Sequence, residues 1–531
     1  MRLSTRSVLR LVFQTQPRPV CSFGSEMVVV SRCARRNASP FSGVFLPDAI
    51  CYEPVCDPIM ERNPAFMGQT TNTSTIMKTM KLLAASLIVC SLVHFPNNAD
   101  GVTGKLLAGT AKLSITPVTD EPLHDPVFAR SLVLEIKGER LAFVAVDLAV
   151  FTSDNVEKIC KEQYGVAKVF LCASHNHTAP SKPGKGPEYS NLKAFYEKQV
   201  IQAVGTAVSN MFPARISAGR RSFPQLGFKR LIIREDGHAR ESWMGDDHYA
   251  PINPERIPFG PVDQEVGVIR VDDTNGQPRV IIMNYACHAD VVCLSYAISA
   301  DFPGVAARKV EEAFGNGVNC LFVNGAAGNV APLFTVPRKT SPNDPFVTDY
   351  TPMERMGELL AFETVKVAKS LASKSEETTL NHQDAALEFT GRFDKTRHLD
   401  VRLTTILIND DIVIAANPGE LFAELGLDWK AKMQAEVANP FYFGYTWNEG
   451  QWPGYVPSIK GAALGGFGAD QDRGMIEVGA GEAIFNKHLE NYFTLTGLMR
   501  DKPGPSGFQR GPRWYVVPVP ENIENKENSV K

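Results

Sequence analysis

Short apolar runs alternate with amphipathic stretches between residues 105 and 500. Runs rich in β-branched and aromatic residues, bounded by Gly, Pro or Asn, predict buried strands at 132–136, 141–148, 166–173, 266–271, 280–285 and 320–323. Residues 403–416 predict two further strands joined by a turn at 409–411. Apolar positions that recur every three or four residues predict helices at 153–164, 190–210, 302–314, 353–373, 419–436 and 481–498. This alternation predicts an α/β fold, a mixed β-sheet flanked by helices, in one domain over 105–500.

The two ends of the chain follow other patterns. Residues 1–76 are rich in Arg, Pro, Ser and Cys with little periodicity, and we expect a mis-annotated or disordered leader there. Residues 77–100 combine a basic start, an apolar run at 82–93 and a polar exit, which is typical of a signal peptide or a signal anchor. We therefore expect an exported protein, periplasmic or secreted, with 82–93 as its anchor if the run is retained. The tail 501–531 is rich in Pro and charge, which predicts disorder.

Charge and cysteine usage argue against a nucleic-acid partner and against a cysteine-rich metal site. The formal net charge is -3 and no basic stripe is present, so nothing indicates nucleic acid as a partner. Five of the ten cysteines precede residue 100, and Cys172, Cys287 and Cys320 lie in apolar runs. This usage predicts small core residues rather than a disulfide framework or a cysteine-rich zinc site.

Histidines follow two of the predicted strands. His175 and His177 come after the run at 166–173, and His288 comes after the run at 280–285. Because side chains alternate across a strand, the first two are expected on the same face. Two imidazoles at the exit of a strand are half of a divalent-metal site. The alternative for any one of them is a hydrogen-bonded core histidine.

Other segments offer candidate oxygen ligands for a metal and a loop of small residues that a substrate could approach. Glu420 follows an apolar strand and opens a helix, so it either ligates a metal or complements the helix dipole. Tyr455, in an aromatic and Gly-rich loop, either ligates a metal, donates to an oxyanion or packs the loop. The small residues of 324–332 allow a backbone or a substrate to approach closely. Asp301 precedes a helix with Pro in its first turn, a pattern that favours an N-cap there over a catalytic role.

The order of these pieces resembles the neutral/alkaline non-lysosomal ceramidases over residues 105–500. In that family a zinc ion is held by two His, a Glu and a Tyr. The resemblance implies that the ligands of Zn2+ here are His175, His288, Glu420 and Tyr455. It places His177 beside the metal rather than on it.

The resemblance also implies a reaction and a class of substrate. Zinc with an open position activates water and polarises an amide carbonyl. His177, Arg230 (in Gly227-Phe-Lys-Arg230) and Tyr455 would stabilise the oxyanion or protonate the leaving amine. The implied substrate is a small-molecule or lipid N-acyl compound, ceramide or a relative, with association at a membrane surface as a further expectation. Asp290 or Asp301 would orient a histidine.

Three departures from the family pattern concern the substrate side. The expected substrate contacts are Asn329, Ala331 and Trp452, and Ala331 stands where the family carries a Ser implicated in catalysis. The residues after 498 are too few for the immunoglobulin-like domain of characterised ceramidases. The loop 445–480 also lacks the family's Glu-Glu-Tyr pattern. We therefore expect that the metal ligands of the family are retained and that the residues contacting the substrate are altered.

Two rival interpretations remain open at this point. An amidohydrolase-type metal hydrolase acting on a non-lipid substrate also opens on a His-x-His strand, but it requires eight βα units in a barrel. A secreted, catalytically degenerate homologue would bind its metal without turnover, as Ala331 suggests. The sequence gives no indication of the oligomeric state.

Overall fold

The strand β1 (Val102–Ser114) is the branch point of a large mixed sheet. In this computed structural model β1 pairs with β13 (Glu377–Thr390) through its first residues and with β2 (Phe128–Ile136) through the rest. It also meets β5 (Phe212–Ser222) at Leu107 and Ala108. The residues that the structure describes are 101–180, 187–223, 226–241, 260–293, 297–315, 317–334, 349–372, 374–470 and 476–500.

Three arms of strands extend from β1, all antiparallel except for the pairs β3–β4, β10–β11 and β15–β17. The first arm is β2, β3 (Glu139–Val146), β4 (Val166–Ala173) and β18 (Thr446–Trp447). The second is β5, β9 (Glu265–Asp273), β10 (Pro278–Tyr285) and β11 (Asn319–Asn324). The third is β13, β14 (His398–Ile408), β15 (Ile412–Ala416) and β17 (Asn439–Phe443).

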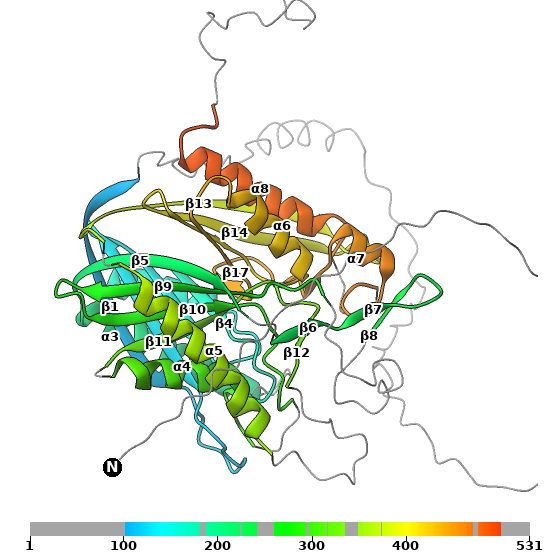
Figure 1. Cartoon of the computed structure of the whole chain (residues 1–531), viewed down its shortest axis with the longest axis horizontal. Helices are drawn as coiled ribbons and strands as arrows, with labels where there is room; N and C mark the ends of the chain where they lie inside the picture. The colour runs from blue at the N-terminus through cyan, green and yellow to red at the C-terminus, as the bar shows by residue number, and fades with distance from the viewer. Residues whose placement is uncertain are drawn as a thin grey trace, which may run out of the picture. The chain divides into compact units, whose positions relative to one another are not determined.

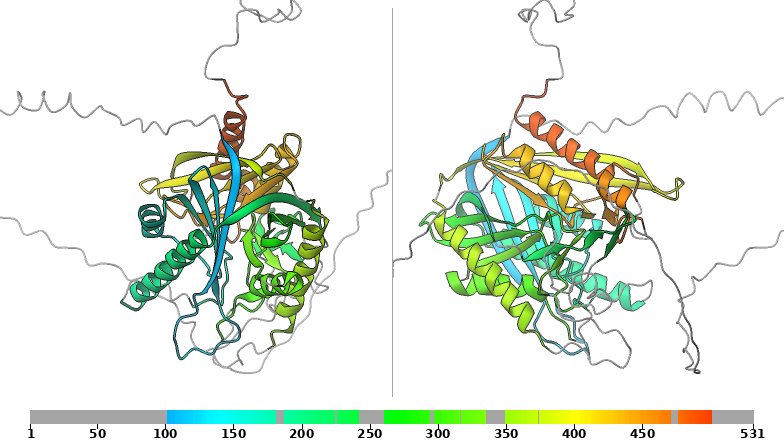
Figure 2. Two further views of the ribbon diagram at one scale, coloured as in Figure 1. Left: turned by 90° about the vertical axis from the view of Figure 1, so that its left-hand side faces the viewer. Right: turned by 45° about the vertical axis from the view of Figure 1, so that its right-hand side comes forward.

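Helices cover the outer face of each arm. The helices are α2 (Asp154–Tyr164), α3 (Pro187–Ser209), α4 (Asp301–Phe314), α5 (Thr351–Ser370), α6 (Ala423–Met433), α7 (Ile459–Leu464) and α8 (Ala480–Leu495). α8 lies over β13 and β14, and α6 packs against α8 and β17 (Figure 1). In the left view of Figure 2, β1 runs between α3 on one side and α4 with α5 on the other.

Three separate two-stranded sheets lie outside these arms. They are β6 (Gly227–Lys229) with β12 (Val330–Pro332), β7 (Leu231–Ile233) with β8 (Ala239–Glu241), and β16 (Glu420–Leu421) with β19 (Tyr455–Val456). The pair β16–β19 is parallel, the other two are antiparallel.

The arms enclose a core that draws on all three of them. Phe143, Ile282 and Ile414, one from each arm, belong to a single cluster of buried side chains between the arms. A second cluster lies under α3, α4 and α5, and a third lies between the third arm and α8, around Trp429. A strand with a core on both faces must be apolar at nearly every position. This explains why β4 appears in the sequence as a continuous apolar run rather than an alternating one.

The predicted fold class, a mixed sheet flanked by helices, is confirmed. The described strands form a branched mixed sheet rather than eight parallel βα units, so the barrel of the amidohydrolase rival is wrong. The helix expected from 419 begins only at Ala423, because Glu420 and Leu421 pair with β19. β1, β5 and β13 were not predicted from the sequence.

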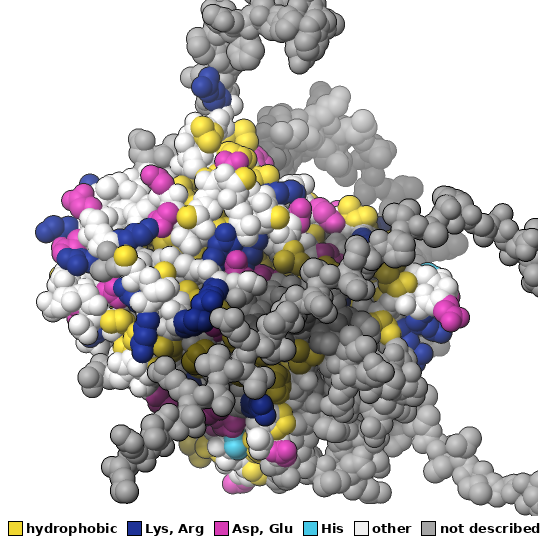
Figure 3. All heavy atoms as spheres, in the orientation of Figure 1, with side chains coloured by type: hydrophobic (Ala, Val, Ile, Leu, Met, Phe, Trp, Pro, Cys, Tyr) yellow, Lys and Arg dark blue, Asp and Glu magenta, His cyan; other side chains and the backbone are white. Residues whose placement is uncertain are grey.

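Several predictions concern residues outside the described ranges: the leader 1–76, the segment 77–100 with its apolar run 82–93, the tail 501–531 and most of the loop 340–350. Among the described helices, none has both the length and the apolar character needed to span a membrane. Acidic and basic side chains are interspersed over the described surface in the face shown in Figure 3.

Candidate metal centre

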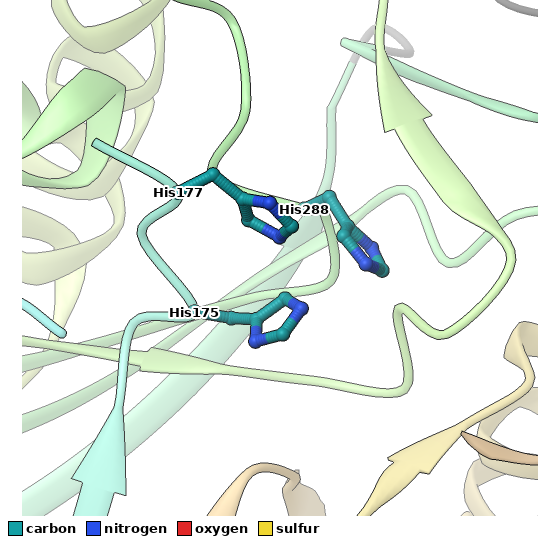
Figure 4. Close-up of side chains that lie close together, drawn as sticks. All are labelled: His175, His177 and His288. Carbon is teal, nitrogen blue, oxygen red and sulfur yellow. The ribbon is translucent and has the colours of Figure 1, made fainter. Parts of the chain in front are cut away.

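Three histidine rings gather where β4 and β10 end. His175 and His177 lie just after β4, and His288 lies three residues after β10. The ring of His175 is 4.7 Å from that of His177 and 4.7 Å from that of His288, measured between centroids (Figure 4). One nitrogen from each ring lies within 4.8 Å of the others, so the three rings offer a group of metal-ligating atoms.

The two histidines of the first segment converge for a reason other than strand alternation. β4 ends at Ala173, and His175 has a φ of 63°, in the left-handed region. The N–H groups of His175 and Asn176 both donate to the carbonyl of Leu148, at 3.0 and 3.2 Å, which holds this turn. The expectation of a shared strand face is therefore wrong, since a strained turn brings the rings together instead.

Hydrogen bonds set the tautomers of His175 and His288. Nδ1 of His175 lies 2.8 Å from the carbonyl oxygen of Ala149, and Nδ1 of His288 lies 2.7 Å from that of Ala327. Because a carbonyl only accepts, each Nδ1 carries the proton and each neutral ring has an unprotonated Nε2. A metal-ligating histidine is oriented in this manner. For both rings the partner of Nδ1 is a main-chain carbonyl rather than Asp290 or Asp301, and the orientation of a histidine by either aspartate stays a prediction for His177.

Both Nε2 atoms face the carboxylate of Glu420. Oε2 of Glu420 lies 3.2 Å from Nε2 of His175 and 3.4 Å from Nε2 of His288. Despite that proximity, Oε2 of Glu420 and Nε2 of His175 are buried and have no hydrogen-bond partner. Buried polar atoms without partners are costly, and a divalent cation between them would satisfy both. Two imidazoles and a carboxylate are donors that suit zinc.

Electrostatics favour an ionised Glu420. Burial alone would raise the pKa of this carboxyl, but His175 and His288 hold it well below its usual range. The pKa values of the two imidazoles shift in opposite directions. Burial opposes protonation of His175, yet Glu420 raises its pKa above the ordinary value. Burial and the nearby Arg230 lower the pKa of His288 to about 4. The two rings thus differ in their charged neighbours: the Glu420 carboxylate dominates at His175, whereas the Arg230 guanidinium adds to the effect of burial at His288.

Tyr455 reaches the same group from β19. Glu420 and Tyr455 are Cα partners in the parallel pair β16–β19, so their side chains extend side by side. The hydroxyl of Tyr455 lies 3.5 Å from Nε2 of His288 and accepts a hydrogen bond of 3.0 Å from Nη2 of Arg230. Burial raises the pKa of Tyr455 above its ordinary value, although Arg230 acts in the opposite direction.

Arg230 is fully buried and links two segments of the site. Its Nη2 also donates to the carbonyl of Gly328 at 2.7 Å, and its main-chain N–H donates to the carbonyl of Asn329 at 3.0 Å. The guanidinium lies over the rings of Tyr455 and Phe467, 5.6 and 5.0 Å from their centroids. The structure thus places Arg230 beside Tyr455 at the candidate metal centre, and its role in catalysis stays a prediction.

His177 and Asp301 occupy different environments. The side chain of His177 is exposed, whereas those of His175 and His288 are buried, so His177 lies at the open side of the group. Asp301 is the first residue of α4, and the N-cap is Ala300, which makes no side-chain cap bond. The carboxylate of Asp301 instead accepts from the N–H groups of Phe302 and Val292, at 2.6 and 3.1 Å. The expected N-cap at Asp301 is therefore shifted by one residue.

The three expected substrate contacts lie in different surroundings. Asn329 is buried, and its amide accepts from Ala423 N at 2.9 Å and donates to Glu424 at 3.0 Å. Ala331 is buried against Phe228, its Cα partner across β12 and β6. Trp452 is half-buried with its ring 6.2 Å from that of Tyr445. Contact of each with a substrate stays a prediction.

Tyr445 is a site residue that the sequence reasoning missed. Its ring lies 4.5 Å from that of His175, its hydroxyl is buried without a hydrogen-bond partner, and its φ is 54°. A left-handed φ at a bulky residue is a rare outlier and costs energy. The signal available in the sequence was weak: a Tyr after Gly444 in an aromatic loop.

The structure of the chain is similar to those of neutral ceramidases. A crystal structure of neutral ceramidase from Pseudomonas aeruginosa matches with a TM-score of 0.56 and 14% identity, covering 76% of each chain. A structure described as ceramidase complexed with C2 matches with the same TM-score and identity, covering 76% of this chain and 77% of that one. No protein-family model matches the sequence, and no curated protein matches it either. The chain therefore has a neutral-ceramidase-like fold.

Proposed function

We propose that this protein is a zinc-dependent hydrolase that cleaves the amide bond of an N-acyl lipid, ceramide or a related compound. One observation carries the proposal. The Nε2 atoms of His175 and His288 both face Oε2 of Glu420, at 3.2 and 3.4 Å, inside a fold shared with neutral ceramidases. The proposed ligands are His175, His288, Glu420 and Tyr455.

Zinc in this position would supply Lewis acidity toward an amide carbonyl and toward water. The residues of the chain supply the rest of the chemistry. Ala149 and Ala327 hold the two imidazoles in the tautomer that leaves Nε2 free. Arg230 donates to the oxygen of Tyr455 and so holds the phenol beside His288.

Charge that develops on the carbonyl oxygen of a substrate would be stabilised by the donors at this centre. Arg230 is permanently charged and buried, and a preorganised charge in a water-excluded site is effective. His177 is the exposed imidazole of the group, yet desolvation and the neighbouring His175 lower its pKa to about 3, so the ring is neutral near pH 7. In the proposed reaction it would first accept a proton from water and then return that proton to the leaving amine. Trp452 and Tyr445 offer aromatic surface next to His175 for the apolar part of a lipid.

The test is a joint measurement of metal content and hydrolysis on the full chain. We expect about one zinc per chain by plasma mass spectrometry, and release of fatty acid from a short-chain ceramide. His175→Ala and His288→Ala should lose both the metal and the activity. His398→Ala is the matched control, because His398 is an exposed histidine at the start of β14, outside the centre.

The outcomes separate the proposal from its rivals. Metal bound with no hydrolysis of any N-acyl compound would support the catalytically degenerate homologue that Ala331 suggests. Absence of stoichiometric metal in the unmodified protein would leave the histidines as core residues and would overturn the proposed function.

A further inference from the structure

A single buried amide side chain connects the segments that carry the histidines. Asn324 is the last residue of β11, where it is the register partner of Tyr285 in β10. Its side chain is fully buried, and it contacts none of the proposed ligands through a hydrogen bond that the structure records. Its four hydrogen bonds all go to the main chain.

Two of these bonds continue the β10–β11 ladder beyond the end of β10. Oδ1 of Asn324 accepts from the N–H of Cys287 at 3.1 Å, and Nδ2 donates to the carbonyl of Cys287 at 2.9 Å. Main-chain groups that leave a sheet inside a protein need replacement partners. The amide supplies both partners to the residue that immediately precedes His288.

One further side-chain bond reaches the segment of His175, and the main chain of Asn324 reaches the segment of Tyr445. Nδ2 of Asn324 donates to the carbonyl of Ser174 at 3.2 Å, one residue before His175. The main-chain carbonyl of Asn324 accepts from the N–H of Gly444 at 2.9 Å, one residue before Tyr445. The remaining acceptor site of Oδ1 is filled by the N–H of Gly325 at 2.9 Å. All donors and acceptors of the side chain are therefore engaged.

We propose that Asn324 is the positioning residue that sets the spacing between His175 and His288, through bonds to the residue before each of them. This inference rests on the proposed metal hydrolase function, in which those two rings share one ion. A satisfied buried amide has one geometry, so it fixes both segments with respect to β11. Without it, each histidine would depend on its own segment alone.

The chain contains a matched control on the neighbouring strand. Asn284, in β10, is also buried, and its Nδ2 donates to two main-chain carbonyls, those of Val323 and Tyr442, at 2.9 and 3.1 Å. Neither carbonyl belongs to a residue adjacent to a proposed ligand. Loss of the Asn284 amide should therefore reduce stability in a similar manner without altering the metal centre.

The experiment compares Asn324→Asp and Asn324→Ala with Asn284→Asp and Asn284→Ala in the full chain. Asp retains the outline of Asn and both accepted bonds but removes the donors to Ser174 and Cys287, so it carries the test if the Ala variant does not fold. We expect both Asn324 variants to bind zinc roughly 10–100-fold more weakly by chelator competition. The d–d spectrum of the cobalt-loaded protein should change as well. The Asn284 variants should match the unmodified protein in both readouts.

A second readout works without metal. Long-range proton–nitrogen correlation spectra of the metal-free, histidine-labelled protein report the tautomer and environment of each ring. Only the Asn324 variants should shift or broaden the signals of His175 and His288. If the unmodified protein binds no zinc, the proposed function fails while this readout still decides the positioning role. Ring signals and zinc affinity that are unchanged in the Asn324 variants, or equally changed in the Asn284 variants, would overturn the proposal.

Discussion

Glu420 and Tyr455 are Cα partners in the short parallel pair β16–β19, although they lie far apart in the sequence. Two main-chain hydrogen bonds hold this pairing. The N–H of Glu420 donates to the carbonyl of Gly454 at 2.9 Å, and the N–H of Phe422 donates to the carbonyl of Val456 at 3.1 Å. Two residues of strand pairing thus deliver a carboxylate and a phenol to His288 together.

Glu420→Gln should abolish stoichiometric zinc binding. The substitution retains the shape of the side chain but removes the charge that faces the two imidazoles. We expect metal content near zero by plasma mass spectrometry, with an unchanged circular dichroism spectrum. Glu424→Gln is the control, because Glu424 faces Lys229 and Asn329 instead. Equal zinc content in the Glu420 variant and the unmodified protein would remove Glu420 from the ligand set.

Tyr455→Phe should reduce turnover while preserving the fold. The ring and its place beside Arg230 are kept, and Arg230 retains the carbonyl of Gly328 as an acceptor. The substitution removes a proposed ligand oxygen and a group beside developing charge, so we expect kcat to fall by roughly 10²–10³-fold. Steady-state kinetics on a short-chain ceramide checks this. Tyr492→Phe, which removes a hydroxyl from α8, should leave kcat unchanged, and a similar loss in both variants would argue against a role for Tyr455.

Gly328→Ala should displace Glu420 from the centre. A Cβ at Gly328 would come within 2.2 Å of the carbonyl oxygen of Glu420, closer than atoms can pack, so one of the two segments must move. We expect weaker zinc binding and a lower midpoint of urea unfolding. The comparison variant is Gly104→Ala, where the added Cβ would meet nothing nearer than 3.3 Å. Zinc affinity unchanged by the Gly328 substitution would show that this contact does not position Glu420.

His488 should make stability depend on pH in the acidic range. Burial lowers the pKa of His488 to about 3, from an ordinary value of 6.5, while its ring contacts Thr405 and Asn417. Between these values the unfolded chain binds a proton that the folded chain does not, so the free energy of unfolding falls as pH falls through that window. The slope due to one such group is at most about 1.4 kcal/mol per pH unit.

The measurement is urea unfolding at a series of pH values from 7 downward, for the unmodified protein and His488→Gln. Other groups titrate in both proteins, so the difference between the two curves isolates His488. The variant should show the shallower dependence on pH. His398→Gln, at an exposed position, should reproduce the unmodified slope, and parallel curves for all three proteins would contradict the prediction.

Ala331→Ser should not increase activity. The methyl group of Ala331 is buried in a small cluster with Phe228, so a hydroxyl there would lie among apolar atoms. We expect a loss of stability on the order of 1–3 kcal/mol from burying that hydroxyl. Thermal unfolding and ceramide hydrolysis check both parts. Activity that appears only after the substitution would instead support the catalytically degenerate interpretation.

The strands that the sequence predicted and those it did not differ in how their hydrophobic signal arises. β4 and β10 are buried on both faces, and a continuous apolar run marks them directly. β13 mixes Asn, Gln, Asp and Glu with few apolar positions, and β1 contains Gly, Ala and Lys. Those two strands owe their structure to partners far along the chain, which a local pattern does not reveal.

The proposed site shows the same division. His175, His288 and Glu420 follow apolar runs, so their positions at strand ends could be inferred, and the structure brings them together. The backbone strain at His175 and the presence of Tyr445 had no comparable signal, because a left-handed φ at a His or a Tyr is imposed by surrounding structure. The role of Asn324 was hidden for a related reason, since its partners are main-chain groups of three separate segments.

The centre is assembled from residues 175, 288, 420 and 455, which belong to all three arms or their connections. Contacts between such distant positions require the closure of long loops, whose entropic cost must be met before the contacts can offset it. A ribosome-bound chain that has not yet released β19 would therefore hold an incomplete set of ligands. Capture of the ion would then mark the completion of folding, and the ion would stabilise the finished chain by mass action rather than guide its early steps.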